Sequence, residues 1–139
     1  MINKIEDLGR NAGKIWETLN SHGSLTKTNL MKKTKLKDDE FYVAIGWLAR
    51  ENKIYDDGTV YRLGETNLTN KIGGDAGKVW KILYACGDID VTYIPKLTDI
   101  PKKDTYIALG WLAKEGKIKS KKVKPKKPQL YFGPINRTR

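Results

Sequence analysis

The sequence of 139 residues contains one cysteine, Cys86, and one histidine, His22. A lone cysteine cannot form a disulfide within the chain, and these two residues cannot supply the ligands of an ordinary zinc site. No apolar run approaches the roughly 20 residues of a transmembrane helix, and the N-terminus lacks the apolar core of a signal peptide. We therefore expect a cytoplasmic protein with no membrane partner, no metal and no cofactor.

Residues typical of a catalytic centre are also missing. No Ser/His/Asp or Cys/His set recurs, and the glycine-rich residues 73–77 neither follow a strand nor have the Lys-Ser/Thr ending of a phosphate-binding loop. Asp38, Asp39 and Glu40 could suggest a cation site, but the helix dipole explains three carboxylates in the first turn of a helix. The sequence predicts no enzyme and no small-molecule substrate.

What the chain does contain is one segment twice. Residues 38–54 and 102–118 share a Gly-Trp-Leu-Ala block at an offset of about 64 residues, and the same offset aligns residues 12–16 with 76–80. About 18 of roughly 44 aligned positions are identical, which indicates a tandem duplication. We expect two units, residues 1–64 (unit 1) and 65–139 (unit 2), which share an interface because such small domains are marginally stable alone.

Local signals predict the same order of elements in both units. Apolar residues at helical spacing predict a first helix over about residues 3–21, ending near Gly23, and a counterpart ending near Gly87. Thr26 and Asp90 are suitable N-caps for a short second helix. His22 aligns with Cys86, which predicts a packing role for that position.

The third helix of unit 1 is expected to open at Asp38, followed by a hairpin with an Asp57-Gly58 turn. This order predicts a fold that is mainly α with small β wings (α+β), built as two tandem winged helix-turn-helix units. Pro95 falls inside the second helix of unit 2, where proline costs about 3 kcal/mol, so that helix must begin late or be distorted. Pro101 suits the first position of the next helix.

The Ala-Gly-Lys-Ile-Trp and Gly-Trp-Leu-Ala blocks resemble those of a small prokaryotic winged helix-turn-helix family, formerly of unknown function. The resemblance covers about residues 5–63 and 69–133. It implies a winged-helix fold and small self-associating units, with no established activity. Members of that family look like single domains, so this chain resembles two fused protomers. Pro95 and the long second wing depart from the pattern.

The outward face of each third helix lacks the side chains that usually read bases in the major groove. We expect these faces to be covered by protein: the other repeat, a first helix carrying Gly9/Gly13 or Gly73/Gly77, or another chain in self-association. The alternative is that the two tryptophans complete the core of their own unit. The predicted interface residues are Tyr42, Val43, Gly46, Trp47, Tyr106, Ile107, Gly110 and Trp111.

Positive charge is concentrated near the C-terminal end. The net charge is +11. Residues 117–139 hold about nine Lys/Arg and no acid, while the rest is close to neutral. We expect nucleic acid, DNA in preference to RNA, to bind the second wing through its phosphates, with weak sequence preference and strong salt dependence. The predicted contacts are Lys102, Lys103, Lys117, Lys119, Lys121, Lys122, Lys124, Lys126 and Lys127.

The interpretation is a non-catalytic, regulatory nucleic-acid-binding protein, and two alternatives to it stay open. The lysine run could serve only to keep the chain soluble. The rival function is a protein-interaction module in a larger assembly, with the third-helix faces as its interfaces.

Overall fold

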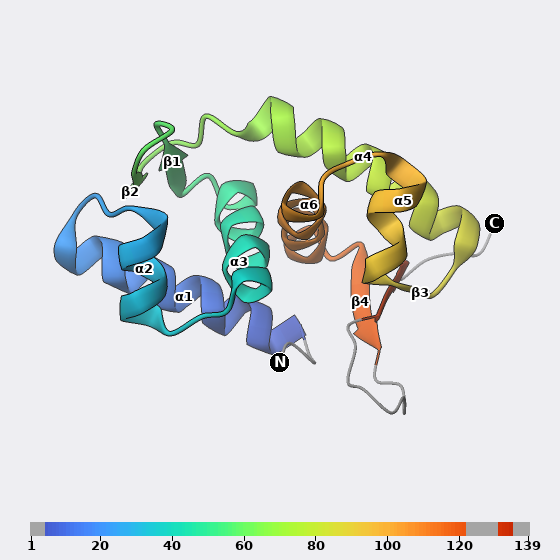
Figure 1. Cartoon of the computed structure of the whole chain (residues 1–139), viewed down its shortest axis with the longest axis horizontal. Helices are drawn as coiled ribbons and strands as arrows, with labels where there is room; N and C mark the ends of the chain where they lie inside the picture. Colours follow the sequence, from blue (N-terminus) through green and yellow to red (C-terminus); the bar gives the residue numbers. More distant parts are fainter. Residues whose placement is uncertain (1–4, 122–130, 135–139) are drawn as a thin grey trace.

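The computed structural model describes residues 5–121 and 131–134. Unit 1 contains α1 (Ile5–His22), α2 (Lys27–Thr34), α3 (Asp38–Arg50), β1 (Ile54–Asp56) and β2 (Tyr61–Leu63). Unit 2 contains α4 (Thr69–Cys86), β3 (Ile89–Asp90), the 3₁₀ turn η1 (Val91–Tyr93), α5 (Ile94–Thr98), α6 (Lys102–Lys114), β4 (Ile118–Lys121) and β5 (Tyr131–Pro134). The protein is mainly α with small β wings. Figure 1 shows the units side by side, with α3 of unit 1 next to α6 of unit 2 at the boundary.

The helix ends in unit 1 follow from local chemistry. Gly23 ends α1 with a φ of 80°, and its N–H donates to the Leu19 carbonyl oxygen at 2.8 Å. The Thr26 hydroxyl accepts from the Asn29 N–H at 3.2 Å, as its N-cap role predicts. His22 is exposed, and so is its counterpart Cys86, so the expected packing role of that position is wrong. The position follows the last buried turn of each first helix, where the chain turns into solvent.

In unit 2, proline reshapes the second helix as expected. The Asp90 carboxylate caps this segment by accepting from the Thr92 N–H at 2.9 Å. The chain then forms η1, and α5 begins only at Ile94, which places Pro95 in the first turn, where no N–H is required. Pro101 is the N-cap of α6 and not its first helical residue, because its ψ of 151° is extended.

The two wings differ in their number of strands. In unit 1, β1 and β2 form a two-stranded antiparallel sheet, and the Asp57 carboxylate accepts from two turn N–H groups at 2.8 Å. In unit 2, the strand order is β3-β5-β4. The sequence predicts a hairpin here, whereas β3 is not predicted because its two residues are too few for a periodic signal. Unit 1 keeps only an isolated bridge between Leu25 and Tyr61 at the equivalent place.

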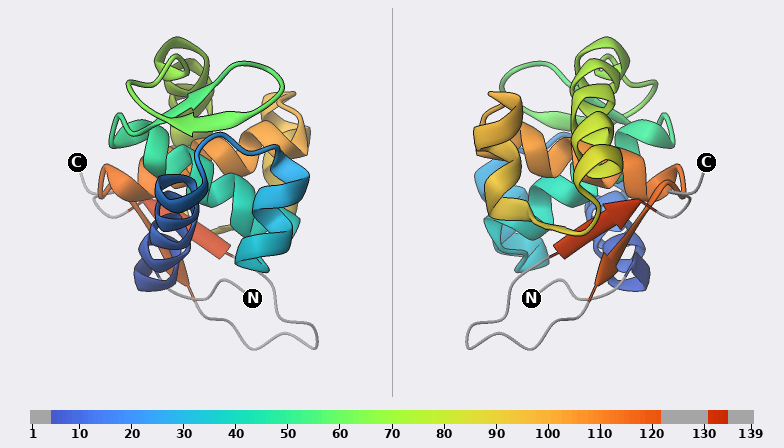
Figure 2. Two further views of the ribbon diagram at one scale, coloured as in Figure 1. Left: turned by 90° about the vertical axis from the view of Figure 1, so that its left-hand side faces the viewer. Right: turned by 90° about the vertical axis from the view of Figure 1, so that its right-hand side faces the viewer.

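The hydrophobic cores cross the boundary between the units. Leu8 and Val43 of unit 1 are fully buried in the cluster formed mainly by unit 2. Ile72, the repeat equivalent of Leu8, is buried in the cluster formed mainly by unit 1. Each unit therefore completes the core of the other, which suits units too small to bury enough apolar surface alone. Figure 2 shows α3 and α6 enclosed by the outer helices in both side views.

Burial of Tyr61 makes stability sensitive to alkaline pH. Its ring packs edge-on against Phe41 at 5.6 Å, and burial, reinforced by Asp56 and Tyr42, raises the pKa of the Tyr61 hydroxyl. Because the folded-state pKa exceeds the unfolded value of about 10, this contribution is complete below pH 10 and is lost as pH rises above it. We expect the free energy of unfolding, measured in urea, to fall less between pH 9 and pH 11 for Tyr61→Phe than for the wild type. Equal losses in the two proteins would contradict this assignment.

Candidate functional site

Helices α3 and α6 cross with their glycines in contact. In Figure 1, α3 runs up the page while α6 is viewed nearly along its axis. A Cβ on Gly46 would lie 1.8 Å from the carbonyl oxygen of Ile107, and one on Gly110 would lie 1.8 Å from that of Val43. No side chain fits at these distances, so the approach of the two backbones requires glycine at both positions.

The tryptophan that follows each glycine covers the first helix of its own unit. A Cβ on Gly9 would lie 3.1 Å from Cζ2 of Trp47, and the corresponding distance between Gly73 and Trp111 is 3.8 Å. Both indoles are half-buried and pack against both core clusters. Gly13 and Gly77 face open space, so these two glycines of the first-helix pairs do not mark a close contact.

Two ion pairs join the C-terminal ends of α3 and α6, and each is the repeat equivalent of the other with the units exchanged. Arg50 Nε lies 3.1 Å from Glu115 Oε2, and Lys114 Nζ lies 3.5 Å from Glu51 Oε2. The Arg50 guanidinium also lies 5.5 Å from the Trp111 ring centre, and the Lys114 ammonium lies 5.4 Å from that of Trp47. The arrangement is that of a two-fold symmetric dimer whose protomers are joined in one chain.

These ion pairs are partly exposed, so we expect each to contribute little. Glu51→Gln or Glu115→Gln should each lower the free energy of unfolding by less than about 1 kcal/mol, and the loss should shrink at high salt. Urea unfolding at two salt concentrations measures it. A loss several times larger, unaffected by salt, would show that the pairs are essential to the crossing.

The predicted interface residues gather at and beside this crossing. Val43, Gly46, Tyr106 and Gly110 are buried, whereas Tyr42, Trp47, Ile107 and Trp111 are half-buried. Tyr42 and Tyr106 line a hollow of about 420 Å³ next to the crossing. The glycines face the other repeat, so these surfaces meet within the chain. None of the ion-paired residues is among the predicted interface residues, although an Arg/Lys-Glu pair follows the Gly-Trp-Leu-Ala block in both repeats.

The predicted nucleic-acid contacts divide into four groups. Lys102 and Lys103 are exposed on the first turn of α6 and line the hollow together with Asp38 and Asp39. Lys117 is exposed, and its Nζ lies 3.6 Å from Glu115 Oε1. The backbone of Lys119 and Lys121 forms part of β4. The remaining four, Lys122, Lys124, Lys126 and Lys127, lie outside the described residues.

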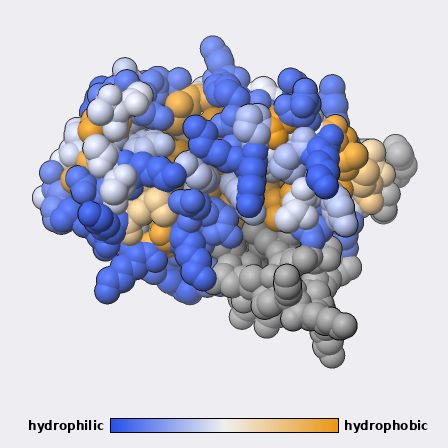
Figure 3. Space-filling view, in the orientation of Figure 1, coloured by the Kyte–Doolittle hydropathy of each residue, from blue (hydrophilic) through white to orange (hydrophobic). Residues whose placement is uncertain are grey.

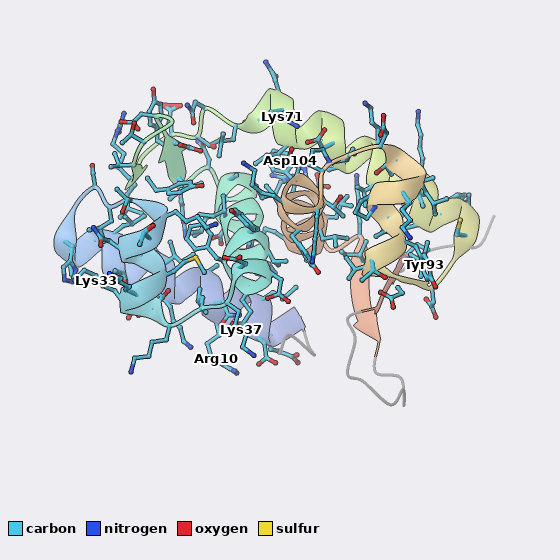
Figure 4. The ribbon with its side chains drawn as sticks, viewed as in Figure 1. Arg10, Lys33, Lys37, Lys71, Tyr93 and Asp104 are labelled. Atoms are coloured by element: carbon cyan, nitrogen blue, oxygen red, sulfur yellow. The ribbon has the colours of Figure 1, made fainter. Side chains whose placement is uncertain are left out.

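A second group of exposed lysines was not predicted. Lys32, Lys33, Lys35 and Lys37 lie on α2 and the turn after it. Figure 4 labels Lys33 and Lys37 on this side of unit 1, and Figure 3 shows hydrophilic residues over much of the same face. The sequence pattern that could have indicated this group is the absence of acidic residues over residues 18–37. The longer basic segment after residue 116, also free of acid, is the more prominent one.

The described residues hold no group of three His, Cys, Asp or Glu side chains that could bind a metal ion. None of the described helices is long and apolar enough to cross a membrane.

The sequence profile of the winged helix-turn-helix domain family (DUF2582) matches the chain twice, over residues 1–63 and 67–131. No curated protein and no solved structure matches it. The two matches together cover nearly the whole chain and coincide with two copies of the same helix order. The chain therefore belongs to the winged helix-turn-helix domain family DUF2582, with two of its domains in tandem.

Proposed function

We propose that this protein binds nucleic acid without catalysis, DNA in preference to RNA, through the basic wing of unit 2. The observation that carries the choice of this surface, in place of the third helices, is the crossing of α3 and α6. In most helix-turn-helix proteins the helix at this position enters the major groove. Here Gly46 and Gly110 lie against carbonyl groups of the opposite helix, so neither face is free to read bases.

The charge distribution supports the wing as the contact surface. Strands β4 and β5 carry the two ends of a segment that is rich in lysine and free of acid. Lysine ammonium groups bind phosphates as point charges and release counterions, which gives affinity without base specificity. The proposal includes a regulatory role, in transcription or chromosome maintenance, because winged helix-turn-helix domains are a DNA-binding fold.

A salt series tests this function. Fluorescence anisotropy of the full chain with labelled duplex DNA, single-stranded DNA and RNA, from about 20 to 300 mM salt, should give log affinity that falls linearly with log salt. Five or more phosphate contacts predict a slope of about −4 or steeper on duplex DNA. Duplexes of different sequence should bind within a few-fold of each other. Absence of binding to all three at 20 mM salt would reject the proposal.

A protein-interaction module remains the second candidate because unit 2 exposes apolar side chains where unit 1 is polar. Tyr93 and Leu97 are 55% and 52% exposed, and their repeat equivalents are Asn29 and Lys33. Figure 4 labels Tyr93 at the far side of unit 2. Absence of nucleic-acid binding even at about 20 mM salt would favour this candidate, whereas a steep loss of binding with rising salt is what the proposed function predicts.

A further inference from the structure

Equivalent positions of the two repeats carry opposite charges around the hollow beside the α3–α6 crossing. Asp38 and Asp39 line it from unit 1, and their repeat equivalents Lys102 and Lys103 line it from unit 2. Lys37 lines it as well, and its equivalent is Pro101. Counting formal side-chain charges, unit 1 thus contributes a net charge of about −1 to the hollow and unit 2 about +2.

The fields of these charges reach across the boundary. Burial, followed by the negative charge of Asp39, raises the pKa of the Tyr106 hydroxyl in unit 2. Asp38 also lies 3.6 Å from Lys27 of its own unit. The carboxylates of unit 1 therefore act on groups in both units.

The rest of the interface does not distinguish one unit from the other. Each unit supplies one close-packed glycine, one tryptophan, one cation and one carboxylate to the crossing. Arg50 of one unit 1 could pair with Glu51 of a second unit 1 as well as it pairs with Glu115, since the positions are equivalent. By these contacts alone, like units could pair as readily as unlike units.

We infer that the charges around the hollow make unit 1 pair with unit 2 and disfavour its pairing with a copy of itself. Two copies of unit 1 would bring four aspartates to the hollow with only two lysines, and two copies of unit 2 would bring four lysines and no acid. The joined chain instead places two aspartates of unit 1 around the same hollow as two lysines of unit 2. A protein with two self-complementary faces risks open-ended assembly between chains, and this charge difference opposes it.

The test is a charge-reversal cycle in the full chain. The variants are K102D/K103D, D38K/D39K and the fourfold exchange D38K/D39K/K102D/K103D. At about 20 mM salt we expect each double variant to melt about 3–5 °C below wild type, and the fourfold exchange to regain at least half of the loss. At about 500 mM salt the differences should nearly vanish, because the Debye length falls below 5 Å.

K102D/K103D is the decisive variant because its other effects have the opposite sign. Each Lys-to-Asp change alters the charge by −2, so the net charge falls from +11 to +7 and general repulsion decreases. Aspartate in the first turn of α6 also suits the helix dipole. A K102D/K103D variant at least as stable as wild type at low salt would overturn the inference, as would a fourfold exchange that shows only the summed losses. Neither result bears on nucleic-acid binding, which the salt series decides.

Discussion

Gly46→Ala is expected to lower the free energy of unfolding by at least about 3 kcal/mol, an effect that only Gly110→Ala should match among the described glycines. The added carbon would lie 1.8 Å from the Ile107 carbonyl oxygen and 2.8 Å from its carbon, both backbone atoms that no rotamer change can move. The two helices would have to separate, and the side chains around the crossing would lose packing on both sides. Thermal unfolding should show a melting temperature lower by about 10 °C or more.

Gly77→Ala is the matched control. It makes the same chemical change inside a helix, but a Cβ there meets nothing within 4 Å. Alanine should therefore raise stability by about 0.5–1 kcal/mol, because glycine loses more backbone entropy on folding. Gly110→Ala should behave like Gly46→Ala, and the double variant should lose less than the sum, since one separation relieves both clashes. A free energy of unfolding for Gly46→Ala within about 1 kcal/mol of the wild-type value would disprove the close contact of α3 and α6 at Gly46.

Neutralising the wing lysines is expected to abolish most nucleic-acid affinity while leaving the fold intact. Changing Lys121, Lys122, Lys124, Lys126 and Lys127 to glutamine removes up to five phosphate contacts. We expect binding to weaken by about 100-fold or more at 50 mM salt, and the salt slope to become shallower by about 4. Anisotropy measures both quantities, and the melting temperature should remain within a few degrees of wild type.

A second variant of equal charge separates location from net charge. Changing five exposed lysines elsewhere to glutamine also takes the net charge from +11 to +6; the set is Lys14, Lys32, Lys33, Lys78 and Lys81. Binding should then weaken by only a few-fold. Equal losses in both variants would place the contact elsewhere, and unchanged affinity in the wing variant would leave the lysine run with solubility as its only role.

Local signals predicted most of the fold. Thr26 and Asp90 cap their segments because a short polar side chain reaches N–H groups two or three residues away. Gly23 and Gly87 end their helices because glycine readily adopts positive φ. Pro95 delays α5 because its ring and missing N–H disturb only the preceding turn. Each of these effects depends on residues within about five positions along the chain.

Strand β3 and the candidate site were harder to predict. The residues Ile89 and Asp90 become a strand only because β5, more than 40 residues later, lies beside them. The Gly-Trp blocks indicated that these helix faces are covered by protein. They did not show whether the other repeat or a second chain covers them, because the same residues would suit either contact. The sequence did not show that Leu8 and Ile72 are each buried in the core of the other unit. Both residues lie at positions that also match the apolar face of their own helix.

The amino-acid sequence by itself determined that this protein is two similar winged helix-turn-helix units with unequal charge, because periodicity, caps and repeats are properties of neighbouring residues. Only the tertiary structure decided that α3 and α6 cover each other and that Asp38 and Asp39 share a hollow with Lys102 and Lys103. Those contacts join residues about 64 positions apart, where shape and charge in space determine the outcome.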